Sequence, residues 1–386
     1  MFKIKKCENF NRRNALGILR LALTLHFVQN FSMKQILGEI AIFELARTNQ
    51  IKEEKMSEKK NEITPEELRS YKSIDTMNRP FSVSLDHLKR MYLSFEFQTL
   101  AITTFGGVLK RAKLIDDFDA AWGNLLDVGP GKSQLKDVWK MMIQMGIHGD
   151  LDKTLAEMEA IGIEHICIDQ CVNWSIRERK RIDCFATVDE IAQWSKESKG
   201  KIVGGFDYYP YRIEDSLKEL EEAVTKHNFK YVWIHTGGYG LTPNDKEWYP
   251  LYAKCSEIGI PVTMQTGQSA EPLLSEQMRP MYADEVAINF PRLNIVLTHT
   301  GWPWVNEWIS MLWRHPNVFG NIGAYMPSSF DPALVKFIGG AGRSKVLWAT
   351  NGLGLTRCKT EFLQLPIAEE AKKAILYDNP KRVFKL

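Results

Sequence analysis

Short apolar runs alternate with helix-like segments along the chain from residue 72 onward. Each run is rich in β-branched or aromatic residues and ends in polar or glycine residues, as buried parallel strands do. Eight such runs occur, at residues 72–78, 165–171, 201–209, 231–237, 261–267, 294–301, 318–325 and 345–352. Helical periodicity fills the intervals, for example at 150–162 and 212–228. This alternation predicts an α/β fold, a (β/α)8 TIM barrel, with a doubly wound open sheet as the alternative.

Two segments do not follow the alternation. Residues 80–150, between the first two predicted strands, are rich in aromatic residues and glycine, and we expect a helical cap inserted in the barrel. Within it, "DVGPGKS" is not expected to bind phosphate, because Leu126 stands where the phosphate-loop motif needs glycine. Residues 1–70 are predicted to be an N-terminal extension, amphipathic or partly disordered, ahead of a barrel at 71–386. No apolar run reaches the ~18 residues of a membrane span, so no transmembrane segment is expected.

Charge and cysteine content narrow the class of protein. The 386 residues carry a net charge of +3, and residues 1–60 hold 12 Lys/Arg against 6 Asp/Glu, so the rest of the chain is slightly acidic. A near-neutral body gives no reason to expect nucleic acid as a partner. The 6 cysteines are scattered along the chain, which favours reduced thiols in a cytoplasmic protein.

Polar side chains stand where the predicted strands end. In chain order they are Asp75, Asp169, Asp207, His235, Gln265, His299, Tyr325 and Asn351. Any one of them alone is more often a satisfied polar group than a catalyst. Because the chemistry of such barrels lies at the carboxyl ends of the strands, the set together predicts an active or ligand-binding site.

The stretch "HTGWPWVNEWISMLWRHPNV" at residues 299–318 and the sequence around it resemble the amidohydrolase-related (Amidohydrolase 2) family. That family includes the aminocarboxymuconate semialdehyde decarboxylase-like enzymes. The resemblance implies a TIM barrel, often a homodimer, that hydrolyses or decarboxylates small aromatic or unsaturated carboxylic acids. It also implies a single divalent metal ion, usually zinc.

The chain departs from this family at most metal-ligand positions. The resemblance places two first-strand histidines on Met77 and Arg79, a fifth-strand histidine on Gln265 and an eighth-strand aspartate on Asn351. Only the sixth-strand histidine is retained, as His299. A catalytic zinc ion needs about three imidazole, thiolate or carboxylate ligands, and a guanidinium repels it. We therefore predict no cofactor and no metal ligand, with zinc in an improvised site as the alternative.

Acid–base groups would then perform the chemistry. We predict His299, Asp75 and Asp207 as catalytic residues. Arg79 would place a positive charge where the resemblance implies a metal ion, and it would bind a substrate carboxylate. A loop arginine paired with an acid is an equal alternative. A structural role is also open for His235, and Trp304 and Trp308 mainly pack a helix. The predicted substrate-binding set is Arg79, Asp169, His235, Gln265, Trp302, Trp304, Tyr325 and Asn351.

The sequence thus predicts a hydrolase or a non-oxidative decarboxylase (lyase) that acts on a small aromatic or unsaturated carboxylate or lactone. The expected partner is this small-molecule carboxylate, with a second copy of the chain in a homodimer. The alternative is a catalytically silent paralogue that binds such a ligand or partners an active, metal-bearing subunit. Loss of several ligand positions at once is what a silent copy would show.

Overall fold

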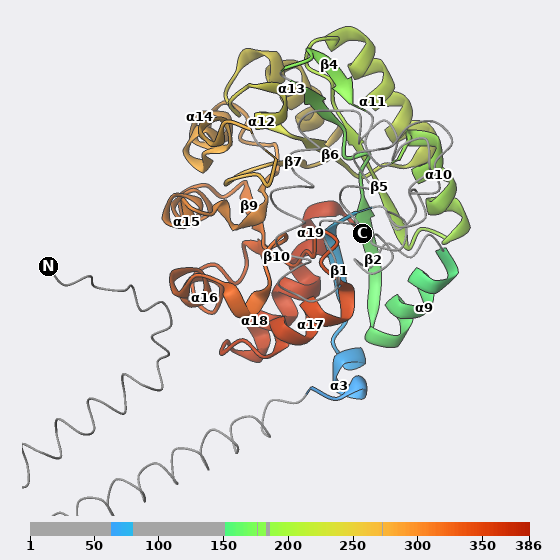
Figure 1. The fold of residues 1–386 in the computed structure, drawn as a ribbon, viewed down its shortest axis with the longest axis vertical. Coiled ribbons are helices and arrows are strands. Elements are labelled where there is room, and N and C mark those ends of the chain that lie inside the picture. The colour runs from blue at the N-terminus through green and yellow to red at the C-terminus, as the bar shows by residue number, and fades with distance from the viewer. Residues whose placement is uncertain (1–62, 80–150, 176, 183–185, 272) are drawn as a thin grey trace, which may run out of the picture. The chain divides into compact units, whose positions relative to one another are not determined.

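Eight parallel strands lie side by side at the centre of the structure, with helices outside them (Figure 1). This computed structural model describes residues 63–79, 151–175, 177–182, 186–271 and 273–386. The strand order is β1-β2-β5-β6-β7-β8-β9-β10. Their bounds are β1 (Ser73–Asn78), β2 (Ile163–Ile168), β5 (Ile202–Asp207), β6 (Tyr231–Ile234), β7 (Val262–Met264), β8 (Ile295–Leu297), β9 (Val318–Asn321) and β10 (Val346–Leu347).

Hydrogen bonds between β1 and the segment after β10 close the sheet on itself. The amide of Thr76 donates to Trp348 O at 3.1 Å, and the amide of Asn351 donates to Met77 O at 2.8 Å. These bonds continue the parallel pattern that joins the other neighbours along the sheet. The fold is therefore the predicted TIM barrel, and the open-sheet alternative is excluded.

Helices surround the ring of strands, and the last of them lies against the barrel interior (Figure 1). They are α3 (Pro65–Ser70), α9 (Leu151–Ile161), α10 (Val188–Glu197), α11 (Ile213–His227), α12 (Thr236–Tyr239), α13 (Tyr249–Ile258), α14 (Ala283–Asn289), α15 (Val305–Arg314), α16 (Pro332–Ile338), α17 (Leu355–Leu363), α18 (Glu369–Lys373) and α19 (Asn379–Phe384). Short helical turns are η2 (Lys246–Trp248), η3 (Ser275–Met278), η4 (Pro280–Tyr282), η5 (His299–Gly301), η6 (Pro327–Ser329) and η7 (Ala374–Asp378).

The helix ends follow the chain's own capping signals. Thr187 and Glu190 form a reciprocal capping box at the start of α10, which satisfies two backbone donors there. Helix α11 begins with Glu214 and Asp215 and ends before Asn228 in the left-handed conformation. Acidic residues at the start and a left-handed residue after the end are the pattern that stabilises isolated helix termini.

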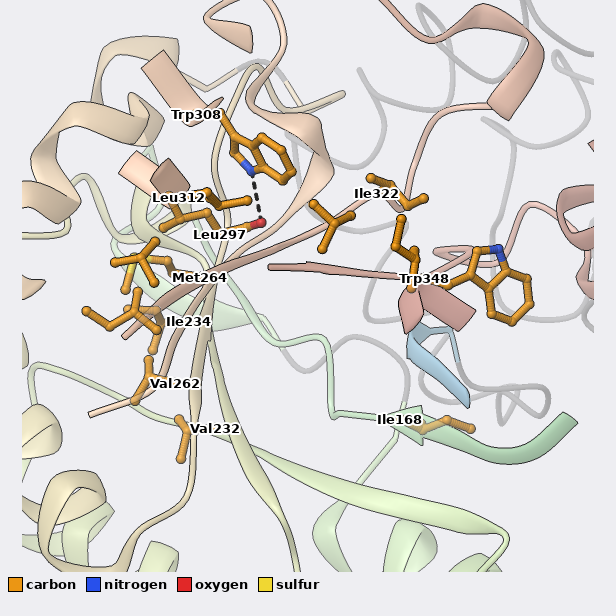
Figure 2. Close-up of a cluster of buried hydrophobic side chains, with 14 of the residues drawn as sticks. Ile168, Val232, Ile234, Val262, Met264, Leu297, Trp308, Leu312, Ile322 and Trp348 are labelled. Atoms are coloured by element: carbon orange, nitrogen blue, oxygen red, sulfur yellow. Dashed lines mark hydrogen bonds between the residues drawn. The ribbon is translucent and has the colours of Figure 1, made fainter. Parts of the chain in front are cut away.

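The outer core lies between the strands and the helices. Figure 2 shows the side chains of Val232, Val262 and Leu297 from neighbouring strands, with Trp308 of α15 beside Leu297. The Trp308 Nε1–H group donates to Leu297 O at 3.1 Å, so the buried indole is satisfied while its rings pack the helix onto the sheet. The prediction that Trp308 packs this helix is confirmed.

A second apolar cluster fills the inside of the ring. Its members are Met77, Cys167, Val203, Tyr231, Trp233, Val296, Phe319, Leu347, Ala349, Val383 and Phe384. The last two come from α19, whose Phe384 ring meets the Tyr231 ring edge-on at a centroid distance of 5.3 Å. The barrel interior is therefore packed at this level, and polar chemistry is confined to the carboxyl ends of the strands.

The observed elements differ from the predicted ones in detail. A hairpin of β3 (Asn173–Ser175) and β4 (Lys180–Ile182) follows β2, and the periodicity did not predict it. Strand β8 ends at Leu297, so His299 lies in the turn after the strand. The predicted cap at 80–150 and residues 1–62 of the predicted extension lie outside the described residues. No helix in the described part of the chain is long and apolar enough to cross a membrane.

Candidate active site at the carboxyl ends of the strands

The polar residues predicted at the strand ends do lie at one end of the barrel. Asp75 is in β1 and Asp207 is the last residue of β5, whereas the others follow their strands within a few residues. The side chains of Asp75, Asp169, Asp207, His235, Gln265 and His299 are buried, and those of Tyr325 and Asn351 are partly buried. Because all eight strands are parallel, their carboxyl ends share one face of the ring.

Strand alternation explains why these side chains point inward. Successive residues of a strand face opposite sides, so a residue two positions beyond an inner residue also faces inward. Met77, Cys167, Trp233 and Phe319 belong to the inner cluster. Two residues beyond them stand Arg79, Asp169, His235 and Asn321. The site is thus the polar continuation of the apolar barrel interior.

Asp75 bridges the seam where the barrel closes. Its Oδ1 accepts from the amides of Met77 at 3.2 Å and Thr350 at 3.0 Å, and its Oδ2 accepts from Thr350 Oγ1 at 2.6 Å. Burial raises the pKa of Asp75 to about 7, and the bond from Thr350 acts in the opposite direction. These contacts give Asp75 a structural role between β1 and β10, and its catalytic role stays a prediction.

Arg79 extends from the end of β1 into the site. Its Nη1 donates to Cys171 Sγ at 2.8 Å and lies 4.0 Å from Asp169 Oδ1, with 19% of the side chain exposed. Its positive charge influences the pKa values of both carboxyls, Asp169 and Asp207, and of both histidines, His235 and His299. The guanidinium therefore stands among the strand-end residues rather than on an outer loop.

Asp169 and Asp207 form a pair of buried carboxyls beside this guanidinium. Burial raises the pKa of Asp169, which Arg79 and a 3.2 Å bond from Tyr231 Oη oppose. Burial raises the pKa of Asp207 well above its ordinary value, and repulsion from Asp169 adds to this. The charges of Arg181 and Arg79 act in the opposite direction on Asp207, so burial and the neighbouring carboxyl are the causes that favour its protonated form.

His235 is held in one tautomer. Its Nδ1 accepts from the amide of Gly238 at 2.9 Å, so the proton of the neutral ring is on Nε2. Burial lowers its pKa, which keeps the ring neutral. Nε2 lies 3.5 Å from Ser269 Oγ and 3.9 Å from Glu271 Oε2, and Ser269 itself donates to Glu271. His235 is therefore a hydrogen-bond donor and does not serve as a base for Ser269.

His299 is the one strand-end histidine with an available ring nitrogen. Burial lowers its pKa well below the ordinary value, and the charges of Arg79 and His235 act in the same direction. Its Nδ1 lies 3.4 Å from Thr298 Oγ1, and a contact with the Asn351 side chain raises its pKa slightly against the other causes. Its buried Nε2 makes no hydrogen bond of good geometry in the described part of the chain. A neutral imidazole with an unoccupied nitrogen can accept or donate a proton to a ligand.

Several other buried polar atoms of the strand-end residues also lack a partner. Within the described ranges they are Asp207 Oδ1, Trp233 Nε1, Asn321 Nδ2 and Asn351 Oδ1. The Trp233 ring lies 6.0 Å from the His299 ring and 6.3 Å from the His235 ring. Buried donors and acceptors are normally satisfied, so a group of unsatisfied ones at a strand-end face indicates a ligand site.

The remaining predicted residues are less central. Trp302 is 47% exposed, and its ring lies 6.3 Å from that of Tyr325. Trp304 is partly buried at the start of α15, where its amide donates to Gly301 O at 2.7 Å. Gln265 is buried, with Nε2 3.5 Å from Thr266 O. The structure thus brings Trp302 and Tyr325 together and assigns Trp304 to the beginning of the helix.

The sequence-based prediction missed Trp233, Asn321, Cys171 and the loop residue Glu271. Two of these had a usable signal. Trp233 precedes His235 by two positions, and Asn321 follows Phe319 by two, so strand alternation alone would have placed both inside the ring. Asn321 was missed because the strand end was assigned to Tyr325, four residues later.

The residues at the implied metal position do not fit a divalent ion. Met77 is packed in the inner apolar cluster, Arg79 is a cation, and Gln265 and Asn351 supply only neutral amides. In residues 63–79 and the described parts of 151–386, no three His, Cys, Asp or Glu side chains converge as a metal site would require. A +2 ion beside the Arg79 guanidinium would also be strongly repelled. No step of the chemistry is therefore assigned to a metal.

Comparisons with known proteins agree with this architecture. A family model described as amidohydrolase matches residues 171–386, and no curated protein matches the chain. An uncharacterised TIM-barrel protein from Bordetella bronchiseptica is 23% identical, with a TM-score of 0.57 over 81% of this chain and 98% of that one.

Two decarboxylases have similar structures. The 5-carboxyvanillate decarboxylase of Novosphingobium aromaticivorans, complexed with manganese and 4-hydroxy-3-methoxy-5-nitrobenzoic acid, is 15% identical, with a TM-score of 0.52 over 82% of this chain and 97% of that one. A dihydroxybenzoic acid decarboxylase from a Polaromonas species, with manganese and 2-nitroresorcinol, is 16% identical, with a TM-score of 0.51 over 82% and 97%. At these identities the likeness shows the shared fold alone.

Proposed function

This chain belongs to the amidohydrolase family, and from that premise we propose that it acts on a small planar carboxylate by acid–base chemistry, without the metal-ligand set that the resemblance implies. The observation that carries the proposal is the place of Arg79. Its guanidinium stands among Asp169, Asp207 and His299 at the position that the resemblance assigns to a metal ligand. A permanent cation there would attract a ligand carboxylate, and its planar fork suits bidentate pairing.

The surroundings of two strand-end groups support acid–base roles. Burial and repulsion from Asp169 raise the pKa of Asp207 well above its ordinary value, which favours the protonated carboxyl. His299 is neutral because burial and Arg79 lower its pKa. A carboxylic acid and a neutral imidazole at one site are the two forms that general acid and general base catalysis need.

Decarboxylation is the first candidate reaction. Asp207 would add a proton to the carbon that carries the carboxylate of the ligand. The carbon–carbon bond to the carboxylate would then break, CO2 would leave, and the electron pair of that bond would restore the conjugated system. Asp207 would recover its proton from water. Two of the similar structures are decarboxylases of aromatic acids, which supports this class without identifying the substrate.

Hydrolysis of a lactone or ring-cleavage product is the second candidate. His299 would accept a proton from water as the water oxygen adds to the carbonyl carbon. The carbon–oxygen bond of the ester would break, and the leaving oxygen would take the proton from the His299 imidazolium. Neutral N–H groups around His299 would stabilise the developing oxyanion.

A silent ligand-binding paralogue remains the alternative proposal. It is favoured by simultaneous substitution at four implied metal positions, Met77, Arg79, Gln265 and Asn351. The homodimer, the N-terminal extension and the helical cap at 80–150 stay predictions of the sequence.

One experiment separates the catalytic proposal from the silent one. The full chain is purified without chelator, its metal content is measured, and small aromatic acids and lactones are screened for turnover. The His299→Ala variant is compared with His227→Ala, a control at the end of the outer helix α11. Turnover without stoichiometric metal, lost in His299→Ala and kept in His227→Ala, supports the enzyme. Ligand-induced thermal stabilisation without any turnover favours the silent paralogue. Stoichiometric metal refutes the proposal that Arg79 takes the place of a metal ligand.

A further inference from the structure

Two asparagines at opposite ends of β9 differ sharply in how their side-chain amides are satisfied. Asn317, just before the strand, donates from Nδ2 to Ala287 O at 3.3 Å and to Phe290 O and Leu293 O at 3.1 Å. Asn321, the last residue of the strand, is fully buried, and its Nδ2 finds no acceptor in the described residues. The first amide holds the fold together, whereas the second has a donor that no described residue accepts.

The orientation of the Asn321 amide is determined by its surroundings. Its Oδ1 accepts from the amide of His299 at 3.4 Å and from the amide of Gly323 at 3.3 Å. Rotating the amide would point its NH2 group at two N–H donors, which is unfavourable. The NH2 group of Asn321 is therefore directed away from these backbone amides, next to His299.

Trp233 supplies a second unused donor beside the same histidine. The side chain is 1% exposed, it belongs to the inner cluster, and its Nε1–H has no acceptor within the described ranges. Its ring meets the His299 ring at 6.0 Å in a T-shaped arrangement. An indole donates but does not accept, so only an acceptor can satisfy it. Strands β6 and β9 thus each present a neutral N–H donor next to His299.

Arg79 is engaged at a different part of the ring from these donors. Its guanidinium meets Cys171 and Asp169, which follow β2, whereas β6 and β9 lie on either side of the β7–β8 pair. A cation would bind a carboxylate that is charged before the reaction. Neutral donors in a low-dielectric site stabilise an oxygen whose negative charge is partial or develops during the reaction.

We propose that Asn321 and Trp233 form a seat for a ligand oxygen, a carbonyl or an oxyanion, that is distinct from the carboxylate held by Arg79. The ligand would therefore carry two oxygen functions, bound at two different places around the end of the barrel. This inference rests on the proposed function and narrows its substrate class. A ligand with a carboxylate alone would leave both donors unsatisfied, and an amine would be rejected at this position.

The test uses isosteric variants of the full chain. Asn321→Asp keeps an oxygen for the two backbone amides but replaces the NH2 donor by a second acceptor. Trp233→Phe removes the indole N–H and keeps a ring. The matched controls are Asn317→Asp, just before the same strand, and Trp248→Phe. Trp248 is also fully buried, and its Nε1 has no partner among the described residues, but it lies in the outer core.

The first readout is binding of 4-hydroxy-3-methoxy-5-nitrobenzoate and of benzoate by titration calorimetry. We expect Trp233→Phe to weaken the first ligand about tenfold and Asn321→Asp about a hundredfold, with benzoate nearly unaffected by Trp233→Phe. Asn317→Asp is expected to lower the melting temperature and leave the Kd unchanged. If Asn321→Asp and Trp233→Phe bind as the wild type does while Arg79→Met binds more weakly, the proposed oxygen site is refuted and the proposed function is retained. Absence of binding in the wild type would overturn the proposed function, and the seat with it.

The second readout needs no ligand. The carboxylate introduced by Asn321→Asp would stand beside the His299 imidazole and stabilise its protonated form, so the His299 pKa should rise in an NMR titration. Asn317→Asp should leave the His299 pKa where it is in the wild type. An Asn321→Asp protein with an unaltered His299 titration would refute the placement of the amide.

Discussion

Replacing Asp75 with asparagine should stabilise the protein at alkaline pH, although Asp75 lies in the predicted site. The carboxyl is fully buried and accepts from the amides of Met77 and Thr350 and from the Thr350 hydroxyl. An asparagine can keep all three contacts, because its oxygen accepts both amides and its NH2 group can donate to the hydroxyl oxygen. The substitution therefore removes a buried charge and keeps these three hydrogen bonds, and the contact of the Asn78 side chain with the carboxylate is the one that it weakens.

The sign of the pH dependence follows from the direction of the pKa change. Burial raises the pKa of Asp75 from 3.8 to about 7, so between these values the folded chain binds more protons than the unfolded chain. The contribution of Asp75 to stability is then fully present below pH ~4 and is lost as the pH rises to about 7. At about 1.4 kcal/mol for each pH unit, the loss reaches an upper limit of about 4 kcal/mol.

The assay is urea unfolding of the wild type and of Asp75→Asn between pH 5 and 8.5 at constant ionic strength. The difference between the two proteins cancels the titration of the other groups, including the buried histidines His235, His299 and His315. We expect the variant to gain about 2–4 kcal/mol over the wild type above pH 7, and the gain to shrink toward pH 5. The control Asp378→Asn, at an exposed position, should show no such trend. A difference that does not vary with pH would refute the account of Asp75.

Four further outcomes test the packing and the site. Gly320→Ala would place a Cβ 2.0 Å from Trp308 Cζ2 and should lower the free energy of unfolding in urea by about 1–3 kcal/mol. The loss should be smaller in a Trp308→Leu background, and equal losses in both backgrounds would contradict the clash. Phe384→Ala should lower the free energy of unfolding by about 3–5 kcal/mol, because it removes the ring packed on the barrel interior. A loss below about 1 kcal/mol would show that α19 does not close the barrel interior. Arg79→Met should weaken aromatic carboxylate binding by about 1.5–3 kcal/mol in calorimetry, and Arg79→Lys by less, whereas equal affinities would remove Arg79 from the site. Excess chelator should leave the melting temperature of the full chain unchanged, and a lower melting temperature would reveal a structural metal.

The sequence allowed the fold to be predicted because its signals are local. Eight apolar runs separated by helical patterns indicate a parallel sheet, and observed strands such as β1, β5 and β6 lie within the predicted ranges. The same apolar runs predicted that Asp169, Asp207 and His235 stand at the ends of strands. The hairpin β3–β4 was not predicted, because strands of three residues carry too little periodicity to be recognised.

The residue types alone determined that Arg79 is permanently charged and that Gln265 and Asn351 supply neutral donors and acceptors. They did not determine which partners these groups meet. The Gly238 amide that sets the tautomer of His235 is local, because it lies three residues further along the chain. The Thr350 amide that engages Asp75 and the His299 amide that helps to orient Asn321 come from other segments of the chain. A pKa or an unsatisfied donor depends on burial and on neighbours in space, and only closure of the ring brings such distant neighbours together.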